Sequence, residues 1–437
     1  MLPAMTKTVI MAVVLLMSLC LQAHAMGYED ERRISRELID MLDAQGALAH
    51  ETDLTWVLQA LTDQLADHIK DPLYTFRIHL VYDCSINAMA IPDGNIFINL
   101  GTVLLAKDMD EIGSVIAHEM GHCQLRHIPE AMKAQTRVTT ASIVGVIAGL
   151  LLSAANPEVG SAVVLSSIGG AENIKRQYTR KNELEADEFS RNLLQDANLD
   201  PSATARFLVR LRSFSDSPTV PEYLLTHPYT EDRIAVLQKD PGPPRPDARY
   251  WTLQTAAIGE LLSEEEVKKR SGALPQPYAK LAVAISKVRS GKNQEGLVLL
   301  EGIDLPLART WKGLALYGLG RTDEAYPLLR ESGQNARTAL ALSEIMMAKG
   351  AVGEAIAVLR PYEDGNPRAA YTMGVLYEKN GQKSLSHASF ARYFFSTRNY
   401  KSSLFHINKA LEDKKLDKDV TERLTRMKKT IDKSQDS

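Results

Sequence analysis

Residues 116–127 read IAHEMGHCQLRH, which places His118 and His122 four positions apart with Glu119 beside the first. On an α-helix, positions i and i+4 lie on the same face, so both imidazoles can reach one metal ion. Glu119 borders that face and can contact a metal-bound water without being a ligand. With only ten histidines in the chain, the pattern is rare by chance. We therefore predict a helix that carries part of a catalytic zinc site. Two unrelated helix histidines are the alternative.

A catalytic site with two histidines needs a third protein ligand and an open position. Residues 173–197 have the pattern of a second helix, and its segment NELEAD places Glu183 and Asp187 four positions apart on one face. We assign Glu183 as the third ligand. Asp187 is expected to accept a hydrogen bond from the far ring nitrogen of a ligand histidine. Glu185 points to another side of the helix and is expected to face solvent.

The segment over 76–101, FRIHLVYDCSINAMAIPDGNIFINLG, changes from helical spacing to alternation of apolar and polar residues. Alternation and the Pro-Asp-Gly turn at 92–94 predict three short strands, the last two forming a hairpin. Residues 28–70 have helical spacing. A further helix is expected from about Asp110, whose carboxylate suits a first helical turn.

The N-terminal 25 residues have the features of an export signal peptide. They contain Lys7, an apolar run over 9–19 and the small-residue motif Ala23-His24-Ala25. The apolar run is short for a bilayer core of ~30 Å, so we favour cleavage over a membrane anchor. Export would place Cys84 and Cys123 in an oxidising compartment, where they either form a disulfide or remain two buried thiols.

The composition excludes few classes of protein. The chain has 437 residues, of which 45% are hydrophobic and 24% charged, so we expect two or three folded domains. A formal net charge of −3 gives no general reason to expect nucleic acid as a partner.

Residues 138–171 form an unusually apolar segment whose only charge is Glu158. Asn156-Pro157 divides it into two arms. The first arm, 138–155, is rich in Ala, Gly, Ser and Thr, which favour membrane insertion only weakly. We interpret the segment as a hairpin that covers the cleft or touches a membrane surface. An integral membrane protease with 138–155 as a spanning helix is the alternative.

The C-terminal region contains an internal repeat. The strings GKNQEG, GRTDEA, GAVGEA and GQKSLS begin at residues 291, 320, 350 and 381, and each lies between two amphipathic stretches. Such a period indicates helix–turn–helix units in which glycine ends one helix. The units resemble tetratricopeptide repeats with a short period, and a non-repetitive helical bundle is the alternative. The Pro-rich stretch 240–250 starts the connection to this region.

Four sequence blocks together resemble the M48 family of zinc metallopeptidases over roughly residues 30–240. The blocks are AHEMGHCQLRH, the preceding NAMAIPDGNIFINLG, NELEAD, and THPYTEDRI at 226–234. The export signal and the helical repeats narrow the resemblance to the periplasmic branch of the family. We therefore expect an α+β, mostly helical fold. It would have a signal peptide over 1–25, a zincin-like metalloprotease domain with a small β-sheet over 26–270, and an α-helical repeat solenoid over 271–437.

The resemblance implies one zinc ion per chain, bound by His118, His122 and Glu183, with Glu119 as general base. It also implies that His227 lies beside the metal. There it would either donate a hydrogen bond to the oxyanion or fill the fourth zinc position in a resting state. We favour the fourth ligand. His127 matches the family pattern, and we expect it to be structural.

In the family, the strand that corresponds to the segment NAMA at 87–90 borders the cleft. The resemblance therefore implies that this strand pairs with an extended substrate, which would add a strand to the sheet. For Asn87 a plain turn residue is the alternative. The residues of this expected substrate-binding strand are Asn87, Ala88, Met89 and Ala90.

The predicted function is a zinc-dependent endopeptidase of the cell envelope. Its expected substrates are unfolded or misassembled outer-membrane and periplasmic proteins, and its expected location is the periplasm, with peripheral membrane contact. The helical repeats would contact the outer-membrane β-barrel assembly machinery. The alternative function is a periplasmic chaperone or assembly factor that binds unfolded outer-membrane proteins. Glu119 argues against a purely structural zinc, because a structural site needs no base.

Overall fold

The computed structural model describes most of the chain. The described residues are 27–49, 52–129, 179–213, 223, 227, 233, 242–332, 335–364 and 366–435. The predicted signal peptide over 1–25 and the apolar hairpin over 138–171 lie outside them. Within the described ranges, the structure contains no helix with the length and apolar character needed to cross a membrane.

A three-stranded sheet lies at the centre of the N-terminal half. Its central strand β3 pairs in parallel with β1 and antiparallel with β2, which gives the order β1-β3-β2. The β2–β3 turn contains Asp93 and Gly94, both with positive φ, as tight hairpin turns require. The predicted three strands and their hairpin are therefore confirmed. The strands are β1 (Arg77–Val81), β2 (Ala88–Ile91) and β3 (Asn95–Asn99).

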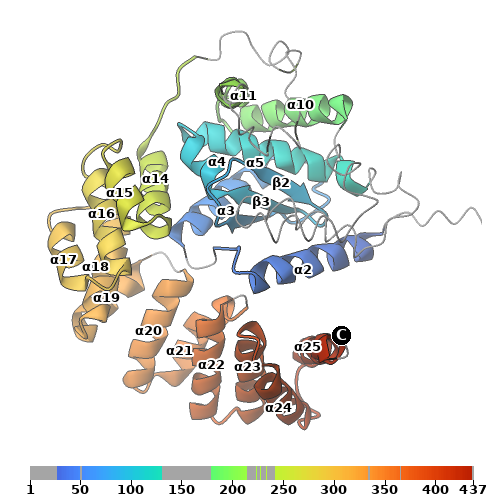
Figure 1. The fold of residues 1–437 in the computed structure, drawn as a ribbon, viewed down its shortest axis with the longest axis vertical. Helices are drawn as coiled ribbons and strands as arrows, with labels where there is room; N and C mark the ends of the chain where they lie inside the picture. Colours follow the sequence, from blue (N-terminus) through green and yellow to red (C-terminus); the bar gives the residue numbers. More distant parts are fainter. Residues whose placement is uncertain are drawn as a thin grey trace, which may run out of the picture.

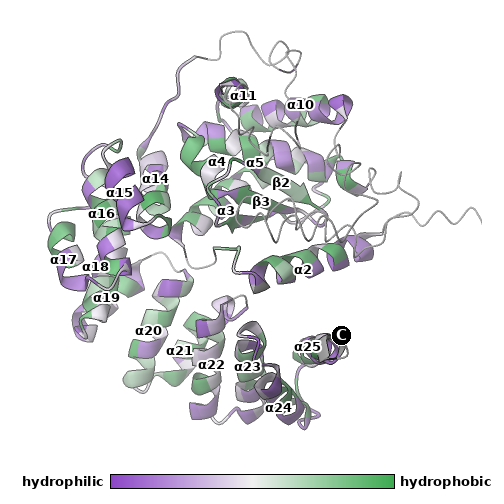
Figure 2. Cartoon of the chain, in the orientation of Figure 1, coloured by the Kyte–Doolittle hydropathy of each residue, from purple (hydrophilic) through white to green (hydrophobic). Residues whose placement is uncertain are grey.

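Helix α5 is the buried helix of this half, and it packs against the sheet, α3, α10 and α11 (Figure 1). Figure 2 shows the strands as hydrophobic, whereas α10 alternates between hydrophilic and hydrophobic residues. The α+β, mostly helical fold is confirmed. The helices here are α2 (Tyr28–Ala44), α3 (Asp53–Ala66), α4 (Leu100–Leu105), α5 (Met109–Gln124), α10 (Arg180–Asp196) and α11 (Ala203–Arg212).

The start of α5 is fixed by Asp108, one residue before the helix begins. Its carboxylate accepts a hydrogen bond from the main-chain N–H of Glu111 at 2.8 Å, which caps the helix. The second carboxylate oxygen contacts the buried Arg206 side chain at 3.1 Å. The helix thus begins close to the predicted position, and Asp110 lies in its first turn.

The C-terminal half consists of helices, and four helix pairs turn at the four predicted glycines. Gly291, Gly320, Gly350 and Gly381 have φ of 76°, 75°, 81° and 76°, in the left-handed region that favours glycine. In each turn, the main-chain N–H of the residue after the glycine donates to the carbonyl oxygen five residues earlier, as Lys292 does to Lys287. The predicted helix–turn–helix repetition is present. Its assignment to tetratricopeptide repeats stays a prediction.

The repeat helices follow two connecting helices in the chain. The connecting helices are α14 (Ala248–Leu261) and α15 (Glu264–Ser271). The four pairs are α16 (Tyr278–Arg289) with α17 (Asn293–Leu300), α18 (Pro306–Gly318) with α19 (Thr322–Glu331), α20 (Ala336–Ala348) with α21 (Val352–Leu359), and α22 (Pro367–Lys379) with α23 (Lys383–Ser396). The last helices are α24 (Tyr400–Leu411) and α25 (Lys418–Gln435).

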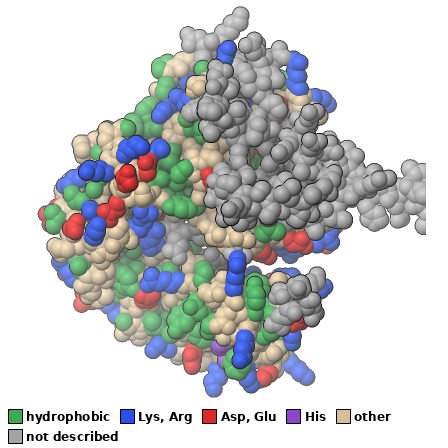
Figure 3. Space-filling view, viewed as in Figure 1, with side chains coloured by type: hydrophobic (Ala, Val, Ile, Leu, Met, Phe, Trp, Pro, Cys, Tyr) green, Lys and Arg blue, Asp and Glu red, His purple; other side chains and the backbone are tan. Residues whose placement is uncertain are grey.

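One apolar core runs without interruption from the sheet into the repeats. The same cluster of buried side chains includes Leu54 of α3, Leu253 of α14 and Ile345 of α20. Helix α14 makes the junction, because it packs against α3, α4 and α16. Over α15 to α18, basic and acidic side chains are interspersed on the visible surface (Figure 3). The domain boundary at 270/271 stays a prediction, and the core is continuous across it.

Cys84 is exposed and Cys123 is buried, and both are free thiols. The disulfide alternative is therefore absent from the structure. Cys123 lies on α5 with its Sγ 3.6 Å from the carbonyl oxygen of Ile91, so it joins α5 to strand β2.

Candidate metal centre

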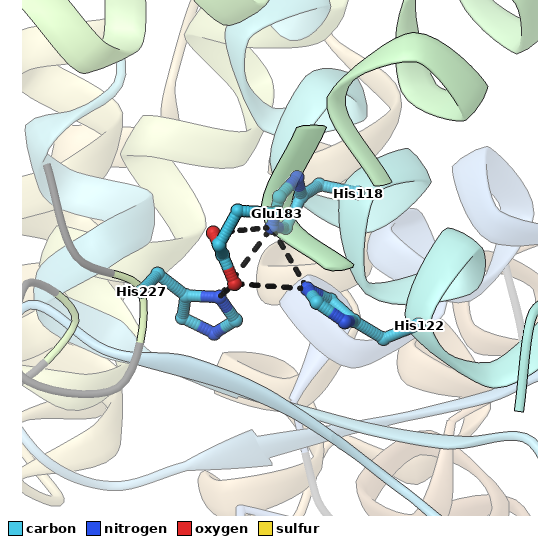
Figure 4. Close-up of side chains that lie close together, drawn as sticks. All are labelled: His118, His122, Glu183 and His227. Carbon is cyan, nitrogen blue, oxygen red and sulfur yellow. Dashed lines mark hydrogen bonds and ion pairs between the residues drawn. The ribbon is translucent and has the colours of Figure 1, made fainter. Parts of the chain in front are cut away.

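Helix α5 presents His118 and His122 on one face, as their spacing predicts. Their Nε2 atoms are 3.0 Å apart, and both side chains are buried (Figure 4). Both rings therefore direct the same type of nitrogen to one point. This follows from the helical period, since residues four apart lie nearly above one another.

Helix α10 packs along α5 and brings Glu183 to the same point. Glu183 Oε1 lies 3.5 Å from His122 Nε2, and Glu183 Oε2 lies 3.6 Å from His118 Nε2. Close packing is possible because Gly121 of α5 faces α10, where an added Cβ would lie 3.3 Å from the Cα of Ala186. The contact of the two helices thus sets the position of the carboxylate.

His227 is the fourth member of the cluster. Its Nδ1 lies 3.1 Å from Glu183 Oε1 and 3.4 Å from His118 Nε2. Two contacts hold it in place: its N–H donates to the Tyr223 carbonyl at 2.8 Å, and its ring stacks on that of Tyr223 at 4.5 Å. The predicted proximity of His227 to the ligand histidines is present.

The four side chains form a donor set suited to a metal ion. One ligand atom from each of His118, His122, Glu183 and His227 lies within 4.8 Å of the others, and all four residues are buried. Imidazole nitrogen with carboxylate oxygen is a usual donor set of zinc in proteins. These residues therefore fit a metal ion.

Asp187 orients His118 from behind. Its Oδ1 lies 3.0 Å from His118 Nδ1, on the side of the ring that faces away from the cluster. Arg233 holds this carboxylate with Nε at 2.6 Å and Nη2 at 2.8 Å, and its Nη1 lies 2.8 Å from Glu183. Asp187 is thus placed as its predicted role requires. The sequence interpretation did not include Arg233.

His127 contacts His122, the other histidine of the α5 pair, in a similar way. Its Nδ1 lies 3.0 Å from His122 Nδ1, and its Nε2 lies 3.3 Å from Glu185 Oε2. The Glu185 side chain is 40% exposed, so it faces solvent as expected, and it also contacts His127. His127 therefore lies next to the site. Its distance from His122 along the chain provides no chemical reason to expect this contact.

The charges of the cluster favour a cation. Burial opposes ionisation of Glu183, but His227, His118 and Arg233 outweigh it and hold the pKa of the carboxyl well below its usual range. Burial likewise opposes ionisation of Asp187, and Arg233 outweighs it, which lowers the pKa. Burial disfavours a charged His118, but the two carboxylates outweigh it and raise the pKa to about 9. The Glu183 carboxylate of the cluster and the adjacent Asp187 carboxylate are thus both anionic.

Glu119 lies beside the cluster, between strand β2 and His227. Its Oε2 accepts a hydrogen bond from the N–H of Ala90 at 2.8 Å, and its Oε1 lies 3.5 Å from His227 Nε2. It is completely buried. The side chain that follows His118 on α5 therefore borders the ligand face without joining it, as predicted.

Strand β2 is one of the two outer strands of the sheet, a position from which an added strand could pair. Its residues Ala88, Met89 and Ala90 are nevertheless buried. Asn87 precedes the strand, and its main chain is held by Thr102, whose Oγ1 accepts from the Asn87 N–H and donates to the Asn87 carbonyl. Substrate pairing here stays a proposal, and it requires that this edge be uncovered.

Comparison with known proteins agrees with this geometry. Residues 54–240 match the model of peptidase family M48. The chain thus contains a domain of peptidase family M48. It is a metalloendopeptidase, and the buried cluster lies within the matched residues.

The relatives include bacterial and mitochondrial proteins. The chain is 27% identical over 383 residues to the Beta-barrel assembly-enhancing protease of Escherichia coli K12, which covers 84% of this chain and 74% of that protein. It is 37% identical over 172 residues to a Putative beta-barrel assembly-enhancing protease of Vibrio cholerae, covering 39% and 34%. It is 28% identical over 168 residues to human Metalloendopeptidase OMA1, mitochondrial, covering 37% and 32%. The first of these similarities extends beyond the M48 residues into the repeats.

Proposed function

We propose that this M48 peptidase is a zinc-dependent endopeptidase of the periplasm that cleaves unfolded or misassembled outer-membrane proteins. The observation that carries the proposal is the convergence of His118, His122 and Glu183, with Glu119 beside them. The substrate class is taken from the name of the Escherichia coli relative. The proposal includes export by residues 1–25, peripheral membrane contact, and contact of the repeats over 271–437 with the outer-membrane β-barrel assembly machinery.

His118, His122 and Glu183 would hold the zinc ion. A bound zinc ion supplies a Lewis acid and lowers the pKa of a water molecule from ~15.7 toward ~7. Glu119 acts as general base: it takes a proton from the attacking water and gives it to the leaving amine. Asp187 and Arg233 keep the ring of His118 in the orientation that directs Nε2 to the centre.

His227 would keep the enzyme inactive in a resting state. Its Nδ1 lies among the ligand atoms, where it can occupy the fourth coordination position, while its Nε2 faces Glu119 at 3.5 Å. One imidazole thus reaches both the position of the attacking water and the general base. Activity then requires that His227 move away.

The test of the ligand and base assignments compares two isosteric variants, Glu119→Gln and Glu183→Gln. Zinc content after dialysis and cleavage of an unfolded outer-membrane β-barrel protein are measured for both. We expect Glu119→Gln to retain zinc and lose hydrolysis, and Glu183→Gln to lose both. Equal loss of zinc in the two variants would show that the roles are wrongly assigned.

The resting-state role of His227 has a separate test. Because the resting ligand blocks the site, His227→Ala should cleave the same substrate faster than the native chain. If His227 instead stabilises an oxyanion, turnover falls substantially in the variant, typically by about a hundredfold or more for one lost donor. A decrease in turnover therefore rejects the resting-ligand role.

A chaperone function is the second candidate, and the long array of repeat helices over 278–435 favours it. The two functions can coexist, because substrate holding and hydrolysis would use different parts of the chain. A Glu119→Gln variant that prevents aggregation of unfolded outer-membrane proteins would support the holding function. Cleavage by the native chain distinguishes the protease from a pure chaperone.

A further inference from the structure

The first helices of the four repeats provide most of the lining of a pocket that is separate from the metal centre. Its volume is ≈ 240 Å³, and it lies among α16, α18, α20 and α22, which alternate with the second helices of the repeats along the chain (Figure 1). Trp311, of which only 1% is exposed, and Leu314 form apolar parts of its lining. Arginine side chains from three of these helices complete it: Arg289, Arg337 and Arg368.

Two of these arginines are only partly neutralised by their contacts. Arg289 donates to the main-chain carbonyls of Glu260, at 2.6 Å, and Leu262, and a carbonyl carries no net charge. Arg368 lies 3.3 Å from Glu344, but its side chain is 65% exposed, so solvent weakens the pair. Glu344 is also bound by the hydroxyl of Tyr317, another lining residue.

The third guanidinium group is fixed in position. Arg337 lies over the Trp311 ring at 4.8 Å, and its Nη1 lies 3.2 Å from Glu260 Oε2. Burial and the nearby Asp53 raise the pKa of Glu260 well above its usual range, so this carboxyl offers Arg337 less negative charge than an exposed glutamate would. The pocket therefore has a rigid guanidinium group on an aromatic surface and two further arginines near its rim.

This combination favours a ligand that carries an anion and an apolar group close together. A guanidinium group matches a carboxylate in geometry and can bind it through two hydrogen bonds. The C-terminal residue of a polypeptide bears its carboxylate and its side chain on the same Cα. An internal aspartate or glutamate bears its charge at the tip of its own side chain, so its anion and the nearest apolar side chain lie on different Cα atoms and farther apart.

We propose that this pocket binds the C-terminal residue of a polypeptide, with the free carboxylate at the arginines and an apolar side chain against Trp311. The site would recognise a chain end, whatever the sequence that precedes it. This binding requires neither a metal ion nor hydrolysis, so it stands independently of the function proposed above.

The test measures binding of fluorescein-labelled hexapeptides that end in phenylalanine. Full-length protein with Glu119→Gln is used, so that hydrolysis does not consume the probe. One peptide has a free C-terminal carboxylate and the other a C-terminal amide. We expect the free acid to bind about tenfold more tightly, the scale of one hydrogen bond to a charged group. Trp311 fluorescence should change on binding, and Trp311→Phe identifies its part of the signal.

Two arginine variants locate the effect. Arg368→Gln removes the exposed arginine of the pocket and should abolish most of the preference for the free acid. Arg330→Gln removes an exposed arginine of α19 that does not line the pocket, and should bind like the parent protein. Equal affinity for acid and amide, or equal loss in both variants, would overturn the proposal. So would equally tight binding of an amidated peptide that ends in glutamate, because it would show that any carboxylate is accepted.

Discussion

The metal centre and the helical repeats bury different kinds of side chain. Around the metal centre, each of seven charged or polar residues is at most 1% exposed. In the repeats, the buried residues at helix contacts are mostly alanine and leucine, while arginine–glutamate pairs such as Arg321 with Glu324 lie on the surface. The metal centre is therefore held together by mutual compensation of charge, and the repeats by packing. The seven residues are His118, Glu119, His122, Glu183, Asp187, His227 and Arg233.

The largest expected difference concerns the two kinds of ion pair. Arg233→Gln leaves Asp187 and Glu183 buried without their guanidinium partner, and such losses cost about 3–5 kcal/mol. Arg321→Gln breaks an exposed pair and should change the free energy of unfolding far less, because solvent screens the two charges. Urea unfolding of both variants measures the difference. Similar values for the two would contradict the idea that compensation of buried charge distinguishes the regions.

A smaller effect is expected from the histidine behind His122. His127→Ala removes the contact that orients this ligand, and loss of such a partner typically weakens metal affinity about 10- to 100-fold. The repeats provide a matched control in His387, whose Nδ1 lies 2.9 Å from that of His406. His387→Ala should leave metal affinity unchanged. The zinc dissociation constant, measured by competition with a chelator, should be partly restored by His127→Asn.

The junction between the regions should respond to pH in the direction opposite to most carboxyls. Burial and the nearby Asp53 raise the folded-state pKa of Glu260 above its usual value of 4.5. The protonated carboxyl therefore favours folding below about pH 4.5, and this contribution is lost as pH rises through the folded pKa. The slope is at most ~1.4 kcal/mol per pH unit for one proton. Unfolding free energies of Glu260→Gln, measured from pH 4 upward, should decline less steeply than those of the native chain.

The smallest effects lie within the repeats. Gly320 has φ of 75°, so Gly320→Ala should destabilise by about 1–2 kcal/mol even though an added Cβ meets no atom within 4 Å. Gly353 also has space around it but lies exposed inside α21, so Gly353→Ala should stabilise by about 0.5–1 kcal/mol. Thermal unfolding of both variants tests the opposite signs. The same sign for both would show that backbone conformation does not control these turns.

The parts predicted from the sequence are those that depend on local spacing. The approach of His118 and His122 follows from helical geometry, and the hairpin follows from Pro-Asp-Gly. The repeat turns follow from their glycines, such as Gly320. Each of these features is encoded within a few consecutive residues, so pattern alone is enough.

The parts that were missed depend on contacts between distant segments. Strand β1 pairs in parallel with β3, with Arg77 opposite Asn95, although β2 lies between the two strands in the sequence. Alternation of apolar and polar residues does not indicate which strands become neighbours. His127 reaches His122 because Arg126 adopts a φ of 56°, held by Glu31 and Tyr74. Nothing in the spacing of these residues indicates that turn. The block that contained His227 also contained Arg233, but a single arginine is usually exposed.

Under the proposed function, the hydrogen bond from the Ala90 N–H to Glu119 would link substrate binding to the state of the general base. A peptide that pairs with the β2 edge would compete for this N–H, and so would release the carboxylate that the reaction needs. Thermodynamic linkage makes this competition reciprocal: the free energy by which a bound peptide weakens the Ala90–Glu119 hydrogen bond equals the free energy by which that hydrogen bond weakens peptide binding. A Glu119 variant without this acceptor should therefore hold extended peptides more tightly than the native chain. Part of the affinity for a substrate would be used to release the catalytic base.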